Sequence, residues 1–420
     1  MPALPADTSP LRIGTHADPA HYRIAFVLVT SLFFLWGFSY GLLDVLNKHF
    51  QETLDITRAR STLLQAAYFG AYFIMALPAA MLMQAKGYKT GILLGLGLFA
   101  TGALLFVPAS SAGTFEFFLL ALFVIACGLA CLETAANPYV TVLGAPENSE
   151  RRLNLSQSFN GLGSFVAPLI GGKLFFGASS VGISGSYGVQ ATYVVIAVVV
   201  VLLALLIWRT HLPDIRQHDY EAVGAAPARP LLQQPHFLWA VVAQFFYVAA
   251  QVGVGALFIN YVTEHVPGIG SERAAYLLAI ALGAFLAGRF LGTALMGVIA
   301  PARLLAIYAV VNVLLCGLVM AGIGWASVVG LVAVFFFMSI MFPTIFALGV
   351  KGLGANTKRG ASFIVMAIVG GAVMPWVMGR IADATDSTAT SFVVPALCFV
   401  AVALYGAFGH RAGRAAPAAR

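Results

Sequence analysis

Long apolar stretches separated by short polar segments dominate the pattern along this chain. Each stretch is about 20 residues long or longer, which is the length of a helix that crosses the hydrocarbon core of a bilayer. None alternates strictly between apolar and polar residues over about ten positions, so the pattern favours a helical bundle over a membrane barrel. The predicted spans are 24–46, 61–84, 89–108, 115–142, 153–175, 190–208, 237–263, 273–297, 302–322, 327–350, 360–380 and 389–408. The sequence therefore predicts an all-α membrane protein with twelve transmembrane helices.

The longest polar segment between spans separates the twelve spans into two sets of six. Residues 211–236 contain several prolines and charges and are typical of a cytoplasmic linker. The predicted organisation is an N-terminal cytoplasmic tail at 1–23, a six-helix bundle at 24–208, a linker at 209–236, a second six-helix bundle at 237–408 and a cytoplasmic tail at 409–420.

The two predicted bundles contain the same ordered set of short motifs. In the first bundle the order is Pro138, Leu143-Gly144, Arg151-Arg152, Ser158-Phe159, Gly163 and Pro168. In the second bundle it is Pro343, Leu348-Gly349, Lys358-Arg359, Ser362-Phe363, Gly370 and Pro375. The spacings from the first proline to Leu-Gly and from the last glycine to the last proline are equal. A parallel duplication of six helices is the arrangement of the major facilitator transporters.

Composition and charge agree with a membrane protein. The chain of 420 residues is 60% hydrophobic and 9% charged, whereas a soluble domain is about 25% charged. The net charge is +7, and with a cytoplasmic N-terminus sixteen of the 23 Lys and Arg residues lie on the cytoplasmic side, six on the outer side and Arg289 within a span. This bias places both termini in the cytoplasm. The basic charge therefore orients the protein and does not indicate a nucleic-acid partner.

No pattern in the sequence indicates a cofactor or catalysis. The four cysteines, Cys127, Cys131, Cys316 and Cys398, all lie within spans and are typical of small core residues rather than disulfides. The eight histidines lack metal-ligand spacing, and the sequence contains no Walker A motif for binding ATP. We therefore expect no enzyme activity, no metal site and no cofactor.

Two acidic residues lie clearly within the predicted spans, Asp44 in the first and Glu133 in the fourth. A charged side chain at the centre of a bilayer costs at least about 2.5 kcal/mol, and such residues usually face the bundle interior and serve a function. The alternative is a structural ion pair or a carboxyl that burial keeps neutral. Lys48, one turn after Asp44, could form such a pair. We favour the functional interpretation for both acids.

Uncharged polar side chains share single faces of other predicted helices. Asn137 lies one turn after Glu133, and two triplets have the spacing i, i+3, i+7: Gln157, Asn160 and Ser164 in the fifth span, and Gln244, Tyr247 and Gln251 in the seventh. Amides bond to hydroxyl groups and aromatic rings cover the apolar face of a sugar. The alternative is hydrogen bonding between helices. Together with Glu133, the two faces predict a cavity for a neutral polyol.

Arg289 lies towards the cytoplasmic end of the eighth span. Its expected role is a guanidinium that extends to the membrane surface, or a contact at a gate.

Several stretches resemble one family closely. These are "CLETAANPYVTVLG", "RRLNLSQSFNGLG", "AQFFYVAAQ", "MSIMFPTIFALGVKGLGANTKRGASFIVMAIVGG" and "VPALCF". They are similar to the fucose–proton symporter family of major facilitator transporters, and the similarity runs from about Ser31 to Phe408. The resemblance implies proton-driven uptake of a monosaccharide across the inner membrane through a central cavity.

The resemblance also implies roles for individual residues. It assigns proton coupling to Asp44 and Glu133, and substrate contacts to Gln157 and Asn160. Leu43 departs from the family, in which asparagine commonly precedes the first-helix aspartate. The sugar therefore stays open among fucose, galactose, glucose and an amino sugar, and fucose is favoured because the tenth and eleventh spans match the fucose members best.

The leading hypothesis is a proton-coupled sugar importer that works by alternating access as a monomer in the lipid bilayer. One alternative is a facilitative uniporter in which Asp44 and Glu133 only bind sugar. Another is a proton-driven exporter of the same fold, for which a larger and more apolar cavity is expected. A membrane receptor needs a sizeable soluble domain, and no loop here is long enough to form one.

Overall fold

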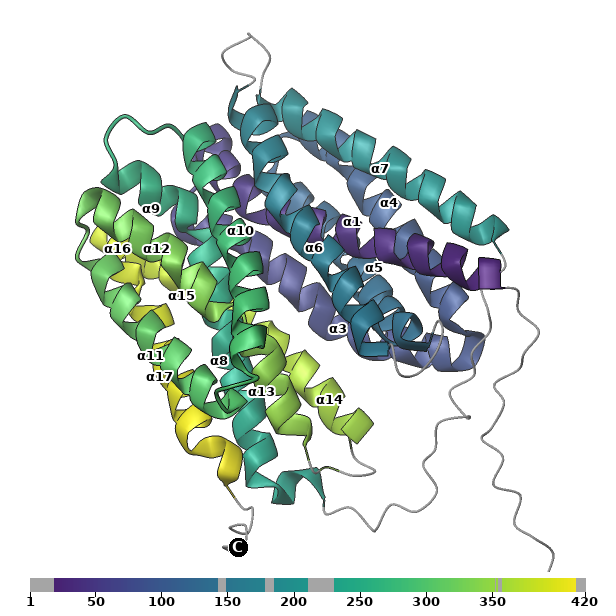
Figure 1. Cartoon of the computed structure of the whole chain (residues 1–420). Helices are drawn as coiled ribbons and strands as arrows, with labels where there is room; N and C mark the ends of the chain where they lie inside the picture. The colour runs from purple at the N-terminus through teal and green to yellow at the C-terminus, as the bar shows by residue number, and fades with distance from the viewer. Residues whose placement is uncertain are drawn as a thin grey trace, which may run out of the picture.

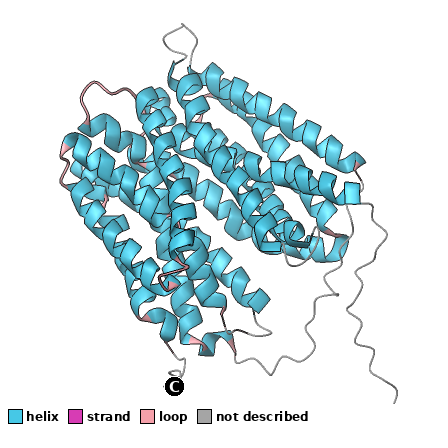
Figure 2. Ribbon diagram, viewed as in Figure 1, coloured by secondary structure: helices cyan, strands magenta, loops and turns pink. Residues whose placement is uncertain are grey.

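The structure is a computed structural model that describes residues 19–142, 149–177, 185–210, 230–351, 353 and 357–412. Across these residues the regular structure is helical and contains no strand, as Figure 2 shows. Twelve segments in the described ranges are long and apolar enough to cross a membrane. The prediction of an all-α protein with twelve spans is confirmed.

The first six spans form one group of helices. They are α1 (Pro19–Leu54), α3 (Leu63–Lys86), α4 (Tyr88–Ala112), α5 (Phe115–Val142), α6 (Ser149–Gly171), which continues into the π-helical turn η2 (Gly172–Phe176), and α7 (Gly185–Arg209). The short helix α2 (Arg58–Ser61) connects α1 to α3. Helix α1 packs against α6 and α5, while α4 packs against α5 and α7.

The remaining spans form a second group, which lies beside the first (Figure 1). Its helices are α8 (Pro235–Ala256), α9 (Phe258–His265), α10 (Ser271–Leu295), α11 (Pro301–Met320), α12 (Gly324–Met338), α13 (Met341–Val350), α14 (Thr357–Met366), α15 (Gly370–Thr385), α16 (Thr388–Ser391) and α17 (Val393–Ala407). Short 3-10 turns are η5 (Leu231–Gln233), η7 (Ala367–Val369) and η8 (Gly409–Arg411). The two groups meet where α6 packs against α10 and where α2 and α3 pack against α15.

Several predicted spans are interrupted in the structure. The seventh is divided at Leu257 into α8 and α9, and the tenth is divided into α12 and α13. The eleventh contains the 3-10 turn η7, and the twelfth is divided at Phe392 into α16 and α17. The break in the tenth follows from Pro343, which has no N–H to donate to the carbonyl of Ser339 four residues earlier. The hydroxyl of Ser339 instead donates to the carbonyl of Phe336 at 2.6 Å.

Helix α1 is longer than the predicted span 24–46 and continues to Leu54. The polar residues that end the apolar stretch, Asn47 and His49, are almost completely buried within the protein. They remain helical because protein contacts replace lipid around them.

The internal repeat corresponds to repeated packing. A Cβ atom added at Gly163 would lie 2.3 Å from the carbonyl oxygen of Phe34 in α1, and one added at Gly370 would lie 2.2 Å from the carbonyl oxygen of Phe245 in α8. Only glycine permits backbones to approach this closely. Helices α1 and α8 begin the two groups, so each copy of the repeat packs in the same way against the first helix of its own group.

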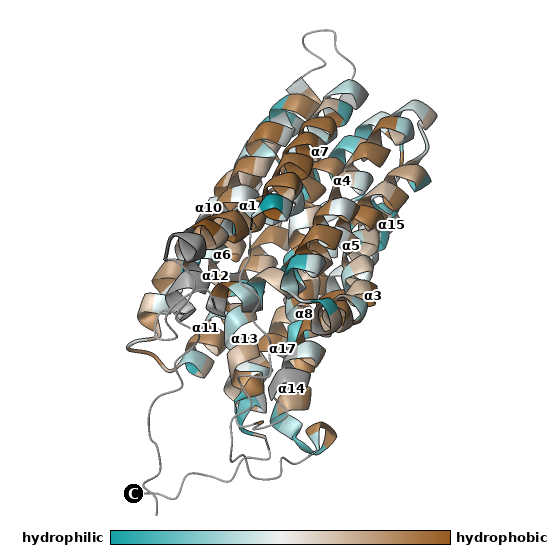
Figure 3. Cartoon of the chain, turned by 90° about the vertical axis from the view of Figure 1, so that its right-hand side faces the viewer, coloured by the Kyte–Doolittle hydropathy of each residue, from teal (hydrophilic) through white to brown (hydrophobic). Residues whose placement is uncertain are grey.

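The outer surface of the long helices is apolar. Helix α7 exposes Val198, Leu202, Leu205 and Trp208, and Figure 3 shows apolar residues along α7 and α4. Such a surface suits contact with lipid chains. The predicted domain boundaries at 208/209 and 236/237 stay a prediction, because most of the linker lies outside the described residues.

Candidate functional site

A cavity of about 2090 Å³ lies between the two groups of helices. Residues of α1, α3, α5 and α6 form one wall, and residues of α8, α10, α13 and α14 form the other. The cavity extends to the turn at Lys86–Tyr88, to Pro301 and to Lys351. By the up-and-down order of the spans, these three places lie on the same side of the membrane as the start of α1. The cavity therefore reaches one membrane surface.

Glu133 borders this cavity from the second half of α5, the chain's fourth span. Its side chain is partly exposed, and it forms no hydrogen bond or ion pair with any described side chain. Asn137, one helical turn later, borders the cavity on the same face of α5. A carboxyl group without a protein partner is available to a ligand or a proton.

The fifth-span triplet separates into two kinds of residue. Gln157 and Asn160 border the cavity, where Nε2 of Gln157 donates to Oδ1 of Asn137 at 3.2 Å. Nδ2 of Asn160 donates to the carbonyl of Phe33 at 3.3 Å. Ser164 lies outside the cavity lining and donates to the carbonyl of Gly37 in α1 at 3.1 Å. Ser164 therefore links helices, while the two amides face the cavity.

The seventh-span triplet divides in the same manner. Tyr247 and Gln251 border the cavity, and the hydroxyl of Tyr247 has no hydrogen-bond partner among the described residues. The ring of Tyr247 makes an edge contact with Phe342, with centroids 6.3 Å apart. Gln244 is fully buried outside the cavity lining, and neither amide atom has a partner among the described residues.

Asp44 lies outside the cavity lining and is 3% exposed. Its Oδ1 accepts a long hydrogen bond of 3.4 Å from Nε2 of Gln65. Its Oδ2 lies 2.6 Å from the position that a Cβ of Gly255 would occupy, so the carboxyl contacts α8 of the other group. Lys48 pairs instead with Glu52 at 3.5 Å, so the structure does not contain the alternative ion pair between Lys48 and Asp44.

Arg289 borders the cavity rather than extending to the membrane surface. Its guanidinium carbon lies 4.8 Å from the centroid of the Phe285 ring, a cation–π distance. Its Nε donates at 3.4 Å to the carbonyl of Ser339, the group that Pro343 leaves free in the helix. Arg289 is therefore a fixed positive charge in the cavity wall.

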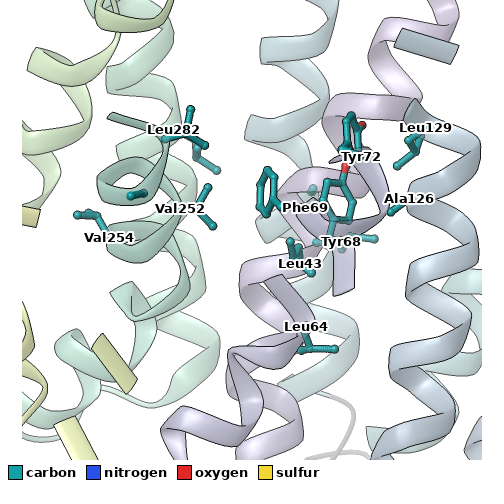
Figure 4. Packing of buried hydrophobic residues seen from close by; sticks show 14 of the residues in the cluster. Leu43, Leu64, Tyr68, Phe69, Tyr72, Ala126, Leu129, Val252, Val254 and Leu282 are labelled. Atoms are coloured by element: carbon teal, nitrogen blue, oxygen red, sulfur yellow. The ribbon is translucent and has the colours of Figure 1, made fainter. Parts of the chain in front are cut away.

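Aromatic residues of α1 and α3 complete the wall beside Glu133, and these were missed in the sequence. Trp36, Tyr40, Tyr68 and Tyr72 border the cavity. The rings of Tyr68 and Tyr72 stack with centroids 5.3 Å apart, and their hydroxyls have no hydrogen-bond partner among the described residues (Figure 4). Gln65, Tyr68 and Tyr72 have the same i, i+3, i+7 spacing as the two predicted triplets. A search of the second span for polar residues at this spacing would therefore have found both tyrosines.

The sequence and the fold are similar to those of known transporters. Residues 29–373 match the Major Facilitator Superfamily. The L-fucose-proton symporter of Escherichia coli is 39% identical over 408 residues, which cover 92% of this chain and 93% of the relative. The glucose/galactose transporter of Brucella abortus is 37% identical over 406 residues, which cover 96% and 98%.

The same relationship is seen in three dimensions. A crystal structure of the Major Facilitator Superfamily transporter FucP in the outward conformation aligns with a TM-score of 0.68 at 39% identity. The alignment covers 92% of this chain and 99% of that chain. The chain therefore belongs to the Major Facilitator Superfamily, within the family of the fucose–proton symporter that its sequence resembles.

Proposed function

We propose that this protein is a proton-coupled monosaccharide importer that works by alternating access. The observation that carries the proposal is Glu133, a carboxyl with no described protein partner in a membrane cavity lined by amides and aromatic rings. The names of the relatives, a fucose–proton symporter and a glucose/galactose transporter, support the same class of substrate.

The cavity chemistry suits a neutral hexose. Gln157, Asn160 and Gln251 offer donors and acceptors to sugar hydroxyls, and Trp36 offers an aromatic face to the C–H side of the ring. The unpaired hydroxyls of Tyr68 and Tyr72 add two further groups whose hydrogen bonds a sugar can complete. L-fucose or a related hexose is the proposed substrate, because the fucose symporter of E. coli covers nearly the whole chain at 39% identity.

Glu133 is proposed to link sugar binding to protonation. A neutral carboxyl carries no charge penalty in the membrane and donates to a sugar hydroxyl, whereas the ionised form favours a hydrated cavity. Proton release on the cytoplasmic side then favours sugar release on that side. Asp44, which the cavity does not reach, is proposed as the second proton-coupling group and responds to the contact between the two groups of helices.

The proposed orientation places both termini in the cytoplasm of a bacterial cell and the twelve spans in its inner membrane. The cavity then opens inwards in this structure, whereas the related FucP structure is in an outward conformation. These two openings are the ones that alternating access requires. We propose one chain as the functional unit, because both cavity walls come from the same chain.

Transport by purified protein in liposomes tests the proposal. Vesicles loaded with unlabelled L-fucose should take up labelled L-fucose by counterflow, and unlabelled D-galactose and D-glucose added outside measure specificity. An inward proton gradient should then drive accumulation above the outside concentration. Counterflow without accumulation would instead indicate the facilitative uniporter. If no monosaccharide undergoes counterflow, the sugar-transport proposal is wrong and the exporter alternative gains support.

A further inference from the structure

We propose that Asp383 is the central residue of an outer latch, which holds the two groups of helices together at the membrane surface opposite the cavity mouth. The outer latch consists of Gln51, Arg58, Ala59, Asn260 and Asp383. This inference relies on the alternating access proposed above, but it is independent of the identity of the sugar.

Asp383 of α15 binds the main chain of the other group. Its Oδ1 accepts from the backbone N–H of Arg58 at 3.0 Å, and its Oδ2 accepts from the backbone N–H of Ala59 at 2.9 Å. Both N–H groups belong to the first turn of α2, where they have no partner within the helix. Charge-assisted hydrogen bonds of this kind are roughly twice as strong as neutral ones. One carboxylate therefore fixes α2 to α15.

The side chain of Arg58 extends the same contact. Its Nη1 donates to the carbonyl of Ala382 at 3.2 Å, and its guanidinium lies 3.5 Å from carboxylate oxygens of Glu264 and Asp386. Glu264 also accepts two hydrogen bonds from the backbone N–H of Thr388, at 2.9 and 3.0 Å. Arg58 thus contacts two helices of the second group, α9 through Glu264 and the C-terminal end of α15 through Ala382 and Asp386.

A pair of amides forms the other part of the latch. The side chains of Gln51 in α1 and Asn260 in α9 donate to each other, at 3.2 and 2.5 Å. One turn before Gln51, Nδ2 of Asn47 donates to the carbonyl of Ala256 at 2.7 Å. Ala256 ends α8, and the last carbonyls of a helix are free to accept. The break at Leu257 therefore supplies an acceptor for α1.

The latch separates two spaces. Gln51, Arg58, Asn260 and Asp383 line a small outer recess of about 390 Å³, and none of them borders the large cavity. Asp44 precedes Asn47 by one helical turn on α1 and contacts Gly255 on α8. A solute that passes from the outer recess to the cavity must separate these contacts. Opening the latch would therefore expose both Asp44 and the cavity to the outer side.

The test measures the outer opening directly. Spin labels at Ser111→Cys in α4 and Ala326→Cys in α12 report the distance between the outer ends of the two groups by pulsed electron resonance, with the native cysteines replaced by serine. Both positions are exposed. In this background Asp383→Ala should raise the ratio of outer-open to outer-closed molecules at least about tenfold, because two charge-assisted hydrogen bonds are lost.

Asp386→Asn is the matched control for charge, because asparagine tolerates the left-handed φ of 48° at this position. The side chain of Asp386 is 97% exposed and contacts Arg58 only at 3.5 Å, so the loss of its charge should leave the distance distribution nearly unchanged. An equal shift in both variants would show that net charge, and not the hydrogen bonds of Asp383, sets the equilibrium. An unchanged distribution in Asp383→Ala would overturn the proposal.

Asn260→Ala gives a second test that does not depend on Asp383. It removes the amide pair with Gln51 and should shift the same distance in the same direction, by a smaller factor. If Asp383→Ala does not fold, the Asn260→Ala result is sufficient by itself: a distance distribution equal to that of the parent protein would overturn the proposal. The measurement needs neither sugar nor a proton gradient, so failure of the latch and failure of sugar transport are distinguishable.

Discussion

The carboxyl of Asp44 in α1 fits against Gly255 in α8, where Oδ2 lies 2.6 Å from the position of an added Cβ. This contact joins the two groups of helices outside the lining of the large cavity. The acid that the sequence places in the first span is thus an interface residue and not a cavity residue. A change at Gly255 should therefore alter proton coupling without touching the sugar.

Gly255→Ala tests that relationship. The added methyl must displace the Asp44 carboxyl or separate α1 from α8, so accumulation driven by a proton gradient should fall several-fold in liposomes. Gly253→Ala is the matched control, because its Cβ would meet the sulfur of Met378, the flexible end of a side chain. Normal accumulation by Gly255→Ala would show that the close contact has no role in coupling.

Glu133 gives the second prediction. Glu133→Ala should insert normally but weaken sugar binding by about 0.5–1.5 kcal/mol, the usual net contribution of a hydrogen bond between neutral groups, because the carboxyl is proposed to bind sugar in its neutral form. Glu133→Gln keeps the hydrogen-bonding capacity, so it should bind sugar with an affinity that no longer depends on pH. The wild-type protein should bind more weakly as rising pH ionises the carboxyl. Calorimetric titration at several pH values separates these outcomes, and equal pH dependence in both proteins would exclude Glu133 as the titrating group.

The sequence predicted those features that a single helix encodes. A carboxylate at Glu133 inside an apolar stretch is a local signal, because its cost depends on the membrane and not on distant residues. The repeated glycines were equally visible in the sequence, although only the structure shows that they pack against α1 and α8. Leu257 was less predictable, since no proline marks the division between α8 and α9.

Features that depend on contacts between distant segments were not predictable. Arg58 and Asp383 are ordinary charges at the ends of spans, and only the fold places Asp383 against the first turn of α2. The surroundings of Asp44 could not be predicted for the same reason, because its neighbours Gln65 and Gly255 belong to other spans. Ser164 and Gln244 had the right spacing but lie outside the cavity lining. Helical periodicity predicts which residues share a face of a helix, but not which of them reach the cavity.

The amides of α6 give a third prediction with an internal control. Gln157→Ala and Asn160→Ala should each weaken sugar binding by about 1–3 kcal/mol, because a buried partner loses its hydrogen bond. Ser164→Ala, on the same face, removes a bond to the carbonyl of Gly37 outside the cavity. It should lower thermal stability but leave sugar affinity unchanged. Loss of stability without loss of affinity in all three variants would show that the whole face only links helices.

The last prediction concerns the proton-coupling role proposed for Asp44. The residue is sealed between the groups of helices, with one long hydrogen bond from Gln65. Because Lys48 pairs with Glu52, no described cation holds Asp44 in its ionised form. An ionised carboxylate in this position would be costly, so the contact with Gly255 favours the neutral form.

Asp44→Asn imitates that neutral form permanently. Sugar exchange at equal concentrations should continue, because exchange requires the groups to move but requires no proton release. Accumulation driven by a pH gradient should stop, because the asparagine can neither bind a proton on the outer side nor release one on the inner side. Lys48→Gln is the control, and it should leave both activities intact since its partner is Glu52. Measuring both activities in the same liposome preparation decides the matter: accumulation that survives in Asp44→Asn would assign the coupled proton to Glu133 alone.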